Sequence, residues 1–326
     1  MAQTTDKLCA KCGLPLEWFD TPAGGDPAKT CQCVVGRSAL ADGIYPAMPE
    51  AEYRALKLPN ATALKVLAQG GTPAHLRAAI DDGGTDTEAQ GFGRLVHRAL
   101  LEPESSANIL PLPPEIKRRA GKEYDALLVG NPGIIYLPPS EWKTHAADVR
   151  EAEKVSAAAH AHPILHELLS ASAKEVTLLW TDTTTGLQCK ARLDMLTADH
   201  LVVADIKTTS KIIPYQIARA AYYFGYHVQF ALYTDAVKTL FNTDPKFYAV
   251  FVEVTPPHLV LVCDGHAAYD ERDQSTRQDS YYELGRSAYL SALVTYRDCL
   301  KTGDWYGHGF DVLEMAIPKN AGMEGL

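Results

Sequence analysis

The sequence has no apolar run that approaches the roughly 20 residues needed to cross a bilayer. Its first seven residues also lack the apolar core of a secretory signal peptide. Basic residues are fewer than acidic ones, since the sequence has 31 Lys and Arg against 40 Asp and Glu, and the net charge is −9. This balance argues against a non-specific nucleic-acid coat, although an enzyme with a local basic groove remains open. We expect a cytoplasmic protein with no membrane partner.

The chain also lacks internal repeats and low-complexity tracts. Its 326 residues can bury one large core, or one core with a small appended module. Composition shifts divide the chain into a cysteine-rich extension over residues 1–36, a main domain over 37–310 and a tail over 311–326. One catalytic domain is therefore the default interpretation.

Four of the seven cysteines, Cys9, Cys12, Cys31 and Cys33, lie close together near the start. An odd total with one tight cluster, and no secretion signal, favours metal binding over a disulfide framework. Thiolates at these spacings can hold one structural zinc ion once the intervening loop folds back. Free thiols in a mobile tail are the alternative, and an iron–sulfur cluster is less favoured.

Hydrophobic periodicity predicts an α/β layout in which helices cover a sheet. Short helical patterns occupy 48–80, and longer ones begin near residue 87, at 146–171, at 212–240 and at 280–300. Strand patterns occupy 175–181, 187–196, 201–208, 246–254 and 258–263, the first three forming a meander. The segment from 111 to 133 is expected to be irregular.

Two acids fall near the ends of adjacent predicted strands, Asp194 on one and Asp205 on the next. Lys207 lies two residues after Asp205, so both side chains project from the same face as Val203. Burying an acid and a lysine on that face is costly unless they pair or hold a metal ion. This strand pair is therefore the first candidate for a functional site.

Phosphodiester hydrolysis needs this set of groups. Two carboxylates and a backbone carbonyl can hold magnesium or manganese, which polarises the phosphoryl oxygen and lowers the pKa of an attacking water. The lysine can orient that water and offset negative charge on the phosphorus. The Asp-x-Lys tripeptide alone is weak, since it often marks a solvated strand end.

Two further elements strengthen the hypothesis. Gln229 and Tyr233 are four residues apart on a predicted helix and share a face with Tyr226. An aromatic core stripe is the simpler explanation, yet such a stripe rarely includes a glutamine, which suits phosphate or water contacts. His97 lies on an upstream helix, where a lone histidine is more often structural than catalytic.

With these residues in place, the sequence resembles the exonuclease VIII (RecE-type) branch of the PD-(D/E)xK nucleases, which is related to the RecB nuclease domain. The resemblance covers about residues 43 to 310, and its matching segments are 93–104, 189–194, 203–209, 225–233, 251–257, 284–289 and 299–305. It implies a restriction-endonuclease-like core, a mixed central sheet flanked by helices. One departure is Leu193, where family members often carry proline.

The resemblance also implies roles for individual residues. Asp194 and Asp205 become magnesium ligands together with the Ile206 carbonyl, Lys207 becomes the catalytic lysine, and His97 approaches the metal. Gln229 and Tyr233, with Tyr226 beside them, line the side that faces DNA. Glu175 is a further catalytic candidate, which a solvated strand start explains equally well.

Family enzymes degrade one strand of duplex DNA from an end, usually 5′ to 3′, for a single-strand annealing protein in recombination. The resemblance therefore implies a DNA exonuclease acting in a bacterial or phage-infected cell, as a homo-oligomer. Two alternatives remain: an endonuclease specific for DNA structure or single strands in repair or defence, and a non-catalytic adaptor that retains the nuclease fold.

Overall fold

The computed structural model describes residues 40–82, 88–103, 109–116, 120–131, 135–266 and 280–309. The four cysteines predicted to bind zinc (Cys9, Cys12, Cys31 and Cys33) and the tail over 311–326 lie outside these residues. Their predicted roles therefore stay predictions. Within the described part of the chain, no helix is both long and apolar enough to span a membrane.

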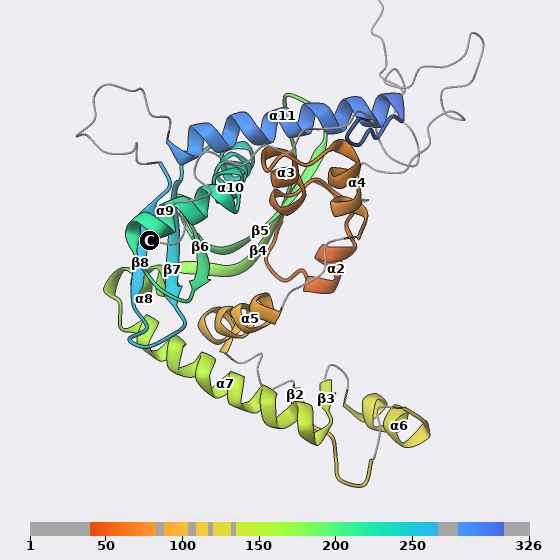
Figure 1. Cartoon of the computed structure of the whole chain (residues 1–326), viewed down its shortest axis with the longest axis vertical. Helices are drawn as coiled ribbons and strands as arrows, with labels where there is room; N and C mark the ends of the chain where they lie inside the picture. The colour runs from red at the N-terminus through yellow and green to blue at the C-terminus, as the bar shows by residue number, and fades with distance from the viewer. Residues whose placement is uncertain are drawn as a thin grey trace, which may run out of the picture.

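A six-stranded mixed sheet forms the centre of the protein (Figure 1). Its spatial order is β1-β4-β5-β6-β7-β8, and every neighbouring pair is antiparallel except β6 and β7, which are parallel. The strands are β1 (Gly43–Tyr45), β4 (Ser172–Thr181), β5 (Gln188–Thr197), β6 (Val202–Thr209), β7 (Lys246–Glu253) and β8 (Val260–Asp264). The predicted meander is confirmed as β4, β5 and β6.

Helices cover both faces of this sheet. The helices of the described residues are α2 (Glu50–Ala55), α3 (Ala61–Ala68), α4 (Pro73–Asp82), α5 (Glu88–Leu101), α6 (Lys122–Gly130), α7 (Pro139–His160), α8 (Pro163–Ala171), α9 (Pro214–Tyr223), α10 (Tyr226–Phe241) and α11 (Tyr281–Thr302), and all but α2 and α6 contribute to the two cores beside the sheet. Because β6 and β7 are parallel, the chain needs a long connection between them, and α9 and α10 provide it. This is the mixed α/β architecture expected from the sequence.

Alternating residues of the central strands feed two separate cores. On β6, Val203 packs with α3, α4, α9, α10 and α11, whereas Ala204 and Ile206 pack with α5, α7 and α8. On β7, Phe247, Ala249 and Phe251 face the first set of helices, and Val250 and Val252 face the second. The period of two that placed Asp205 and Lys207 on the face of Val203 is therefore present.

The helical signal at 146–171 is divided into two helices, and the segment 212–240, which the sequence predicts as one broken or two consecutive helices, forms two. Pro163 begins α8 after a short break from α7, because proline suits the first turn of a helix and not its interior. Gly225, with φ 69°, separates α9 from α10 in the left-handed conformation that glycine adopts readily. The second break matters for the site, since α10 carries Gln229.

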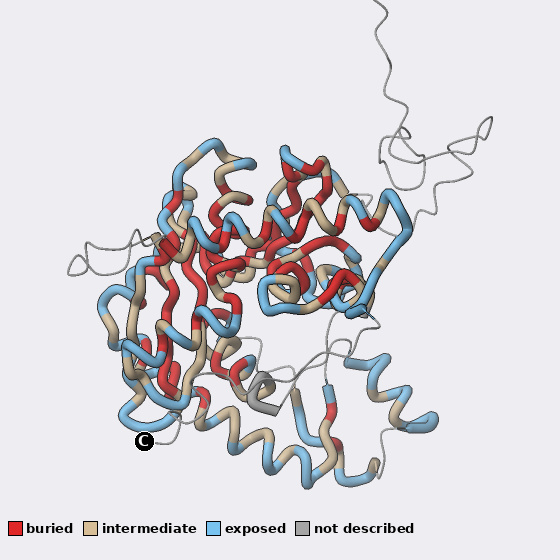
Figure 2. Tube along the Cα trace, turned by 45° about the horizontal axis from the view of Figure 1, so that its top comes forward, coloured by how far each residue is buried: buried red, intermediate tan, exposed pale blue. Residues whose placement is uncertain are grey.

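The expectation that 111–133 is irregular is wrong in part. A short parallel pair, β2 (Ile109–Pro111) with β3 (Ile135–Leu137), and helix α6 occupy this region. They lie beside the start of α7 and project from the body of the protein (Figure 1). The tube in Figure 2 is largely intermediate or exposed here, and α6 has no buried residue. Such short elements carry little sequence signal because neighbouring segments stabilise them.

Helix α11 packs closely against α10. A Cβ atom added at Gly285 would lie 1.8 Å from the His227 carbonyl oxygen, so only glycine permits this approach. At the start of α11, the Ser280 side chain accepts a hydrogen bond from the Glu283 backbone N–H, and the Glu283 carboxylate accepts one in return. The two helices therefore meet with a fixed start and a fixed separation.

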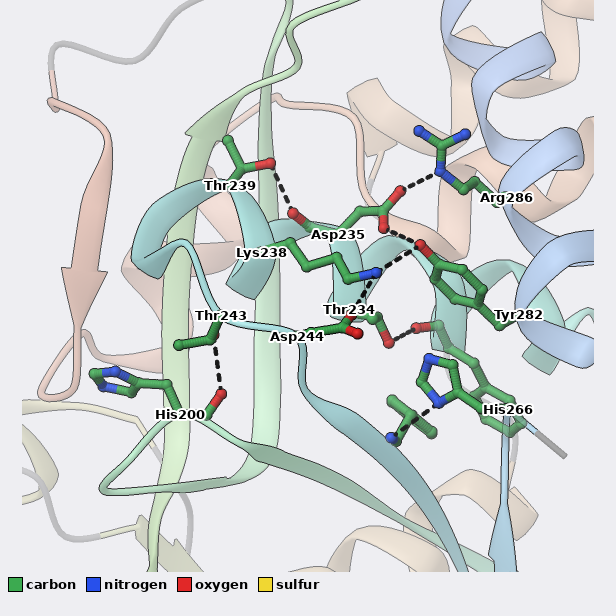
Figure 3. Close-up of polar contacts among 12 residues, drawn as sticks. His200, Thr234, Asp235, Lys238, Thr239, Thr243, Asp244, His266, Tyr282 and Arg286 are labelled. Carbon is green, nitrogen blue, oxygen red and sulfur yellow. Dashed lines mark hydrogen bonds and ion pairs between the residues drawn. The ribbon is translucent and has the colours of Figure 1, made fainter.

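A partly buried aspartate strengthens the same helix pair (Figure 3). The Asp235 carboxylate on α10 accepts hydrogen bonds from the Tyr282 hydroxyl at 2.6 Å and from Arg286 Nε at 2.9 Å. The Tyr289 hydroxyl also donates to it. Both of its oxygens are thus satisfied by donors on α11, and we call these four residues the Asp235 cluster.

Candidate metal centre

Three carboxylates form a row across three adjacent strands. In the β4–β5 register, Glu175 and Asp194 occupy the opposing positions at which the regular pairing is interrupted. The β5–β6 register, continued by one residue beyond the pair Met195–Ala204, brings Asp194 opposite Asp205. Neighbouring strands lie only about 5 Å apart, so three negative groups are crowded together. We call Glu175, Asp194 and Asp205 the acid row.

Glu175 enters the row through an unusual backbone conformation. Its φ is 52°, in the left-handed region that a non-glycine residue seldom occupies in a strand. The carboxylate pairs with Arg192 Nε at 2.6 Å, and the same guanidinium donates to the Met48 carbonyl at 2.9 Å. Burial raises the pKa of Glu175, and the Arg192 charge offsets part of that rise.

Asp205 and Lys207 form an ion pair on the predicted face of β6. Asp205 is 2% exposed, and its Oδ2 contacts the Lys207 ammonium. Apart from this pair, Oδ2 has no hydrogen-bond partner among the described residues. Burial alone would lower the pKa of Lys207, but the Asp205 and Asp194 carboxylates outweigh it and raise that pKa. The lysine is thus held as a cation beside the acid row.

Helix α10 supports this pair from the side. The Gln229 amide donates to Asp205 Oδ1 at 2.7 Å, and a further side-chain hydrogen bond links Gln229 with Tyr233. Lys207 Nζ lies 5.0 Å from the centre of the Tyr226 ring. Tyr233 is only 7% exposed, and its predicted contact with DNA stays a prediction. It lies beneath the site and positions Gln229.

Asp194 links the row to the β6 backbone. Its Oδ2 accepts a hydrogen bond from the Ile206 backbone N–H at 2.6 Å, and His97 Nδ1 lies 3.5 Å from the same oxygen. Burial, and then repulsion from Asp205, raises the pKa of Asp194 well above its ordinary value. A group that resists ionisation in this way would gain from a bound cation.

His97 reaches the row from the opposite helical layer, on α5. A Cβ atom at Gly93 would lie 2.9 Å from Thr208 Oγ1, so glycine permits α5 to approach the end of β6. Burial, together with the charge of Lys207, lowers the pKa of His97 to about 4. Its imidazole is therefore neutral at neutral pH, which is the form that ligates metals.

The residues present fit a divalent cation. His97, Glu175 and Asp194 each offer a ligand atom, and these atoms lie within 4.8 Å of one another. Asp205 is not in that group, but its carboxylate adjoins Asp194 and has an oxygen without a hydrogen-bond partner among the described residues. Carboxylate-rich ligand sets with one imidazole suit magnesium or manganese.

Two basic residues near the row were missed by the sequence analysis. Arg192 precedes Asp194 by two residues, a spacing that would have placed both side chains on the same face of the predicted strand. Lys65, on α3, has its pKa lowered by burial and then by the charge of Lys207, while Asp205 acts in the opposite direction. Its one signal was a single charge within an otherwise uncharged helix.

Comparison with known proteins adds one family match. The family model described as "PDDEXK-like domain of unknown function (DUF3799)" matches residues 61–264, which include all three acids, Lys207 and His97. No curated protein matches this sequence.

Two solved structures are similar to the chain at low sequence identity. The crystal structure of a "Putative exonuclease" from Eubacterium rectale has 13% identity and a TM-score of 0.48, over 82% of this chain and 92% of that one. The crystal structure of SSO0001 has 16% identity and a TM-score of 0.25, over 48% of this chain and 67% of that one. At these scores neither likeness assigns a fold or a function to this chain.

Proposed function

This chain belongs to the PDDEXK-like family, and we propose that it is a metal-dependent DNA nuclease that hydrolyses phosphodiester bonds from duplex ends. The observation that carries the proposal is the convergence of three carboxylates, a neutral histidine and a buried lysine at the centre of one sheet. Acids that repel one another inside a protein destabilise its fold. A bound cation would relieve this repulsion, which explains why the acids lie together.

In this proposal His97, Glu175 and Asp194 hold the metal ion, with Asp205 and the Ile206 main chain beside them. A bound divalent cation would polarise the phosphoryl group and lower the pKa of the attacking water. Lys207 orients that water and offsets negative charge as it grows on the phosphorus. Gln229 keeps the Asp205 carboxylate in place, so that its second oxygen stays directed at Lys207.

The presence of the acid row together with His97 and Lys207 also argues against the non-catalytic alternative. A protein that used this fold only to bind DNA would not need Glu175 in a left-handed strand conformation or Asp194 with a raised pKa. The duplex end as substrate, the 5′ to 3′ direction, the annealing partner and the homo-oligomer rest on the resemblance and are part of the proposal.

The test compares two forms of duplex DNA. Purified protein is incubated with end-labelled linear duplex and with covalently closed circular duplex, each with magnesium, with manganese or with chelator. We expect loss of the linear substrate with either metal, no reaction with chelator, and an intact circle.

Cleavage of the closed circle at the same rate would replace the exonuclease by an endonuclease. No cleavage of any substrate with any metal, by a folded protein that still binds DNA, would favour the adaptor and refute the proposed activity. The position of the label on each strand reports the direction of degradation.

A further inference from the structure

The exposed face of α9 is unusually aromatic. Five large aromatic side chains are exposed among the described residues, and four of them lie between positions 215 and 224. These are Tyr215, Tyr222, Tyr223 and Phe224, with exposures of 64%, 54%, 63% and 55%. The buried side of the same helix carries Ile217 and Ala221. Helix α9 therefore has an ordinary core face, while rings occupy the side that normally carries polar groups.

A cation lies within this aromatic face. The Arg219 guanidinium is 5.7 Å from the centre of the Tyr215 ring and 5.9 Å from that of Tyr223. These three residues are spaced four apart, so they follow one line along the helix. The line spans roughly 12 Å, the length of about three stacked nucleotides.

The segment that contains this face has basic residues and no acidic ones. Between Asp205 and Asp235 the sequence contains no Asp or Glu, although the whole chain has 40 of them and a net charge of −9. The same segment carries Lys207, Lys211 and Arg219. An acid-free aromatic and basic surface on an acidic protein complements a polyanion with flat, unpaired bases.

Contacts connect the aromatic face to the acid row. The rings of Phe224 and Tyr226 are 5.8 Å apart, and the Tyr226 ring lies 5.0 Å from Lys207 Nζ. The Gln69 side chain, at the C-cap of α3, donates to the Tyr223 carbonyl at 2.9 Å, and a Cβ atom added at Gly225 would lie 3.0 Å from Lys65 Cβ in α3. The charges of Lys207 and Asp205 act on the pKa of Lys65. A strand lying on α9 would thus lead toward the candidate metal centre.

We propose that the exposed face of α9 binds single-stranded DNA, stacking its bases on Tyr215, Tyr223 and Phe224 while Arg219 contacts the phosphates. Base stacking on aromatic side chains tolerates any sequence, which suits a strand that enters or leaves a nuclease site. That this strand is substrate or product rests on the proposed nuclease function. The binding itself does not.

The experiment measures binding in the presence of chelator, so that hydrolysis plays no part. Fluorescence anisotropy of a labelled oligothymidylate is followed with the full-length wild type and with the double variant Tyr215→Ser/Tyr223→Ser. Stacking on one ring contributes about 1 to 3 kcal/mol, so we expect affinity to fall at least about tenfold. The double variant Tyr215→Phe/Tyr223→Phe, which keeps both rings, should bind like wild type.

Tyr306→Ser is the matched control, because Tyr306 is also exposed (56%) but is hydrogen-bonded through its carbonyl to α4, away from α9. It should leave affinity unchanged. Arg219→Gln should reduce the dependence of binding on salt, since about one phosphate contact is lost. Thermal unfolding of every variant checks that the fold is retained, as expected for exposed positions.

Wild-type affinity in the Tyr215→Ser/Tyr223→Ser variant would overturn the proposal. So would a change in molecular mass of that variant, measured by light scattering, together with unchanged DNA binding, because the face would then join protein copies. Loss of binding in the serine variant, with a wild type that cleaves no DNA, would support the α9 surface and refute only the nuclease activity.

Discussion

Two groups of acidic side chains, each at least partly buried, differ in the partners that surround them. In the Asp235 cluster, a single carboxylate accepts hydrogen bonds from two hydroxyls and a guanidinium, of which Figure 3 shows the Tyr282 hydroxyl and the Arg286 guanidinium. In the acid row, Asp194 lies beside Asp205 and Glu175; burial raises its pKa most, and repulsion from these two acids raises it further. The Asp235 carboxylate finds all its hydrogen-bond donors within the protein. The three carboxylates of the acid row, in contrast, outnumber the two cations beside them, Lys207 and Arg192.

This difference separates a structural carboxylate from a functional one. A buried acid that is fully satisfied by donors joins two helices and has no capacity left for a ligand. A buried acid that adjoins other acids stores repulsion, which a cation can relieve. The two groups therefore predict opposite consequences of mutation: loss of stability at Asp235 and loss of activity in the acid row.

The largest expected effect is at Asp205. Asp205→Ala should lower the rate of DNA hydrolysis on the order of 10³-fold, because a preorganised charge at the reacting phosphate is lost. The free energy of unfolding without metal should change little, since repulsion with Asp194 is also removed. Initial rates on end-labelled duplex measure the effect.

Asp244→Ala is the control, because Asp244 is 85% exposed and pairs only with Lys238 in the described residues. Hydrolysis by Asp205→Ala at the wild-type rate would show that the acid row is not the catalytic site.

The next effect is on stability. Asp235→Ala should lower the free energy of unfolding by about 3 kcal/mol, because Tyr282, Tyr289 and Arg286 lose their common acceptor. Urea denaturation measures this loss. Well below the melting temperature, the hydrolysis rate should stay within about twofold of wild type. A folded, stable Asp235→Ala protein without activity would show that Asp235 is needed for activity, and the proposed difference between the two groups would be wrong.

A smaller effect is expected at Lys207. Lys207→Ala should slow single-turnover hydrolysis about 100-fold, the lower end for a residue that assists proton transfer. DNA affinity, measured with chelator, should change less than about threefold. Lys238→Ala removes a lysine that lies beside the Asp235 cluster and should alter neither quantity. Equal losses of affinity and rate would make Lys207 a binding residue instead.

The smallest effect concerns pH. The pKa of Asp194 is raised in the folded state, so folding stabilises its protonated form. That contribution is full below the ordinary aspartate pKa of 3.8 and is lost as pH rises through the raised value. Metal-free Asp194→Asn lacks this loss and should be more stable than wild type at neutral pH.

Urea denaturation at acidic and neutral pH, with chelator, measures the difference between Asp194→Asn and wild type. Magnesium should stabilise the wild type and not the variant, because a ligand that binds only the folded state shifts the equilibrium. A variant that is less stable than wild type at neutral pH would contradict the proposed repulsion.

The sequence predicted much of the acid row because its signal is local. Strand periodicity alone placed Asp205 and Lys207 on one face, and the hairpin between β5 and β6 brought Asp194 opposite. Glu175 was a doubtful candidate, since a charged strand start is common. Its left-handed conformation, which turns it into the row, is visible only in the structure.

What the sequence missed depends on long-range packing. Lys65 is 142 positions before Lys207, so no periodicity connects them, yet α3 brings them together. The spacing of Gln229 and Tyr233 predicted a shared face of α10 but not its depth in the protein. The same holds for β2, β3 and α6, which are too short to be recognised without their neighbours.

The close contact at Gly285 has a consequence for the order in which the protein matures during synthesis. All residues of the acid row, and Gln229 on α10, precede α11 in the chain. Until α11 is synthesised, the side of α10 that packs against it stays exposed, so the helix that holds Gln229 against Asp205 is less firmly supported. The support that α10 gives to the proposed site therefore depends on a helix that is synthesised after every residue of that site.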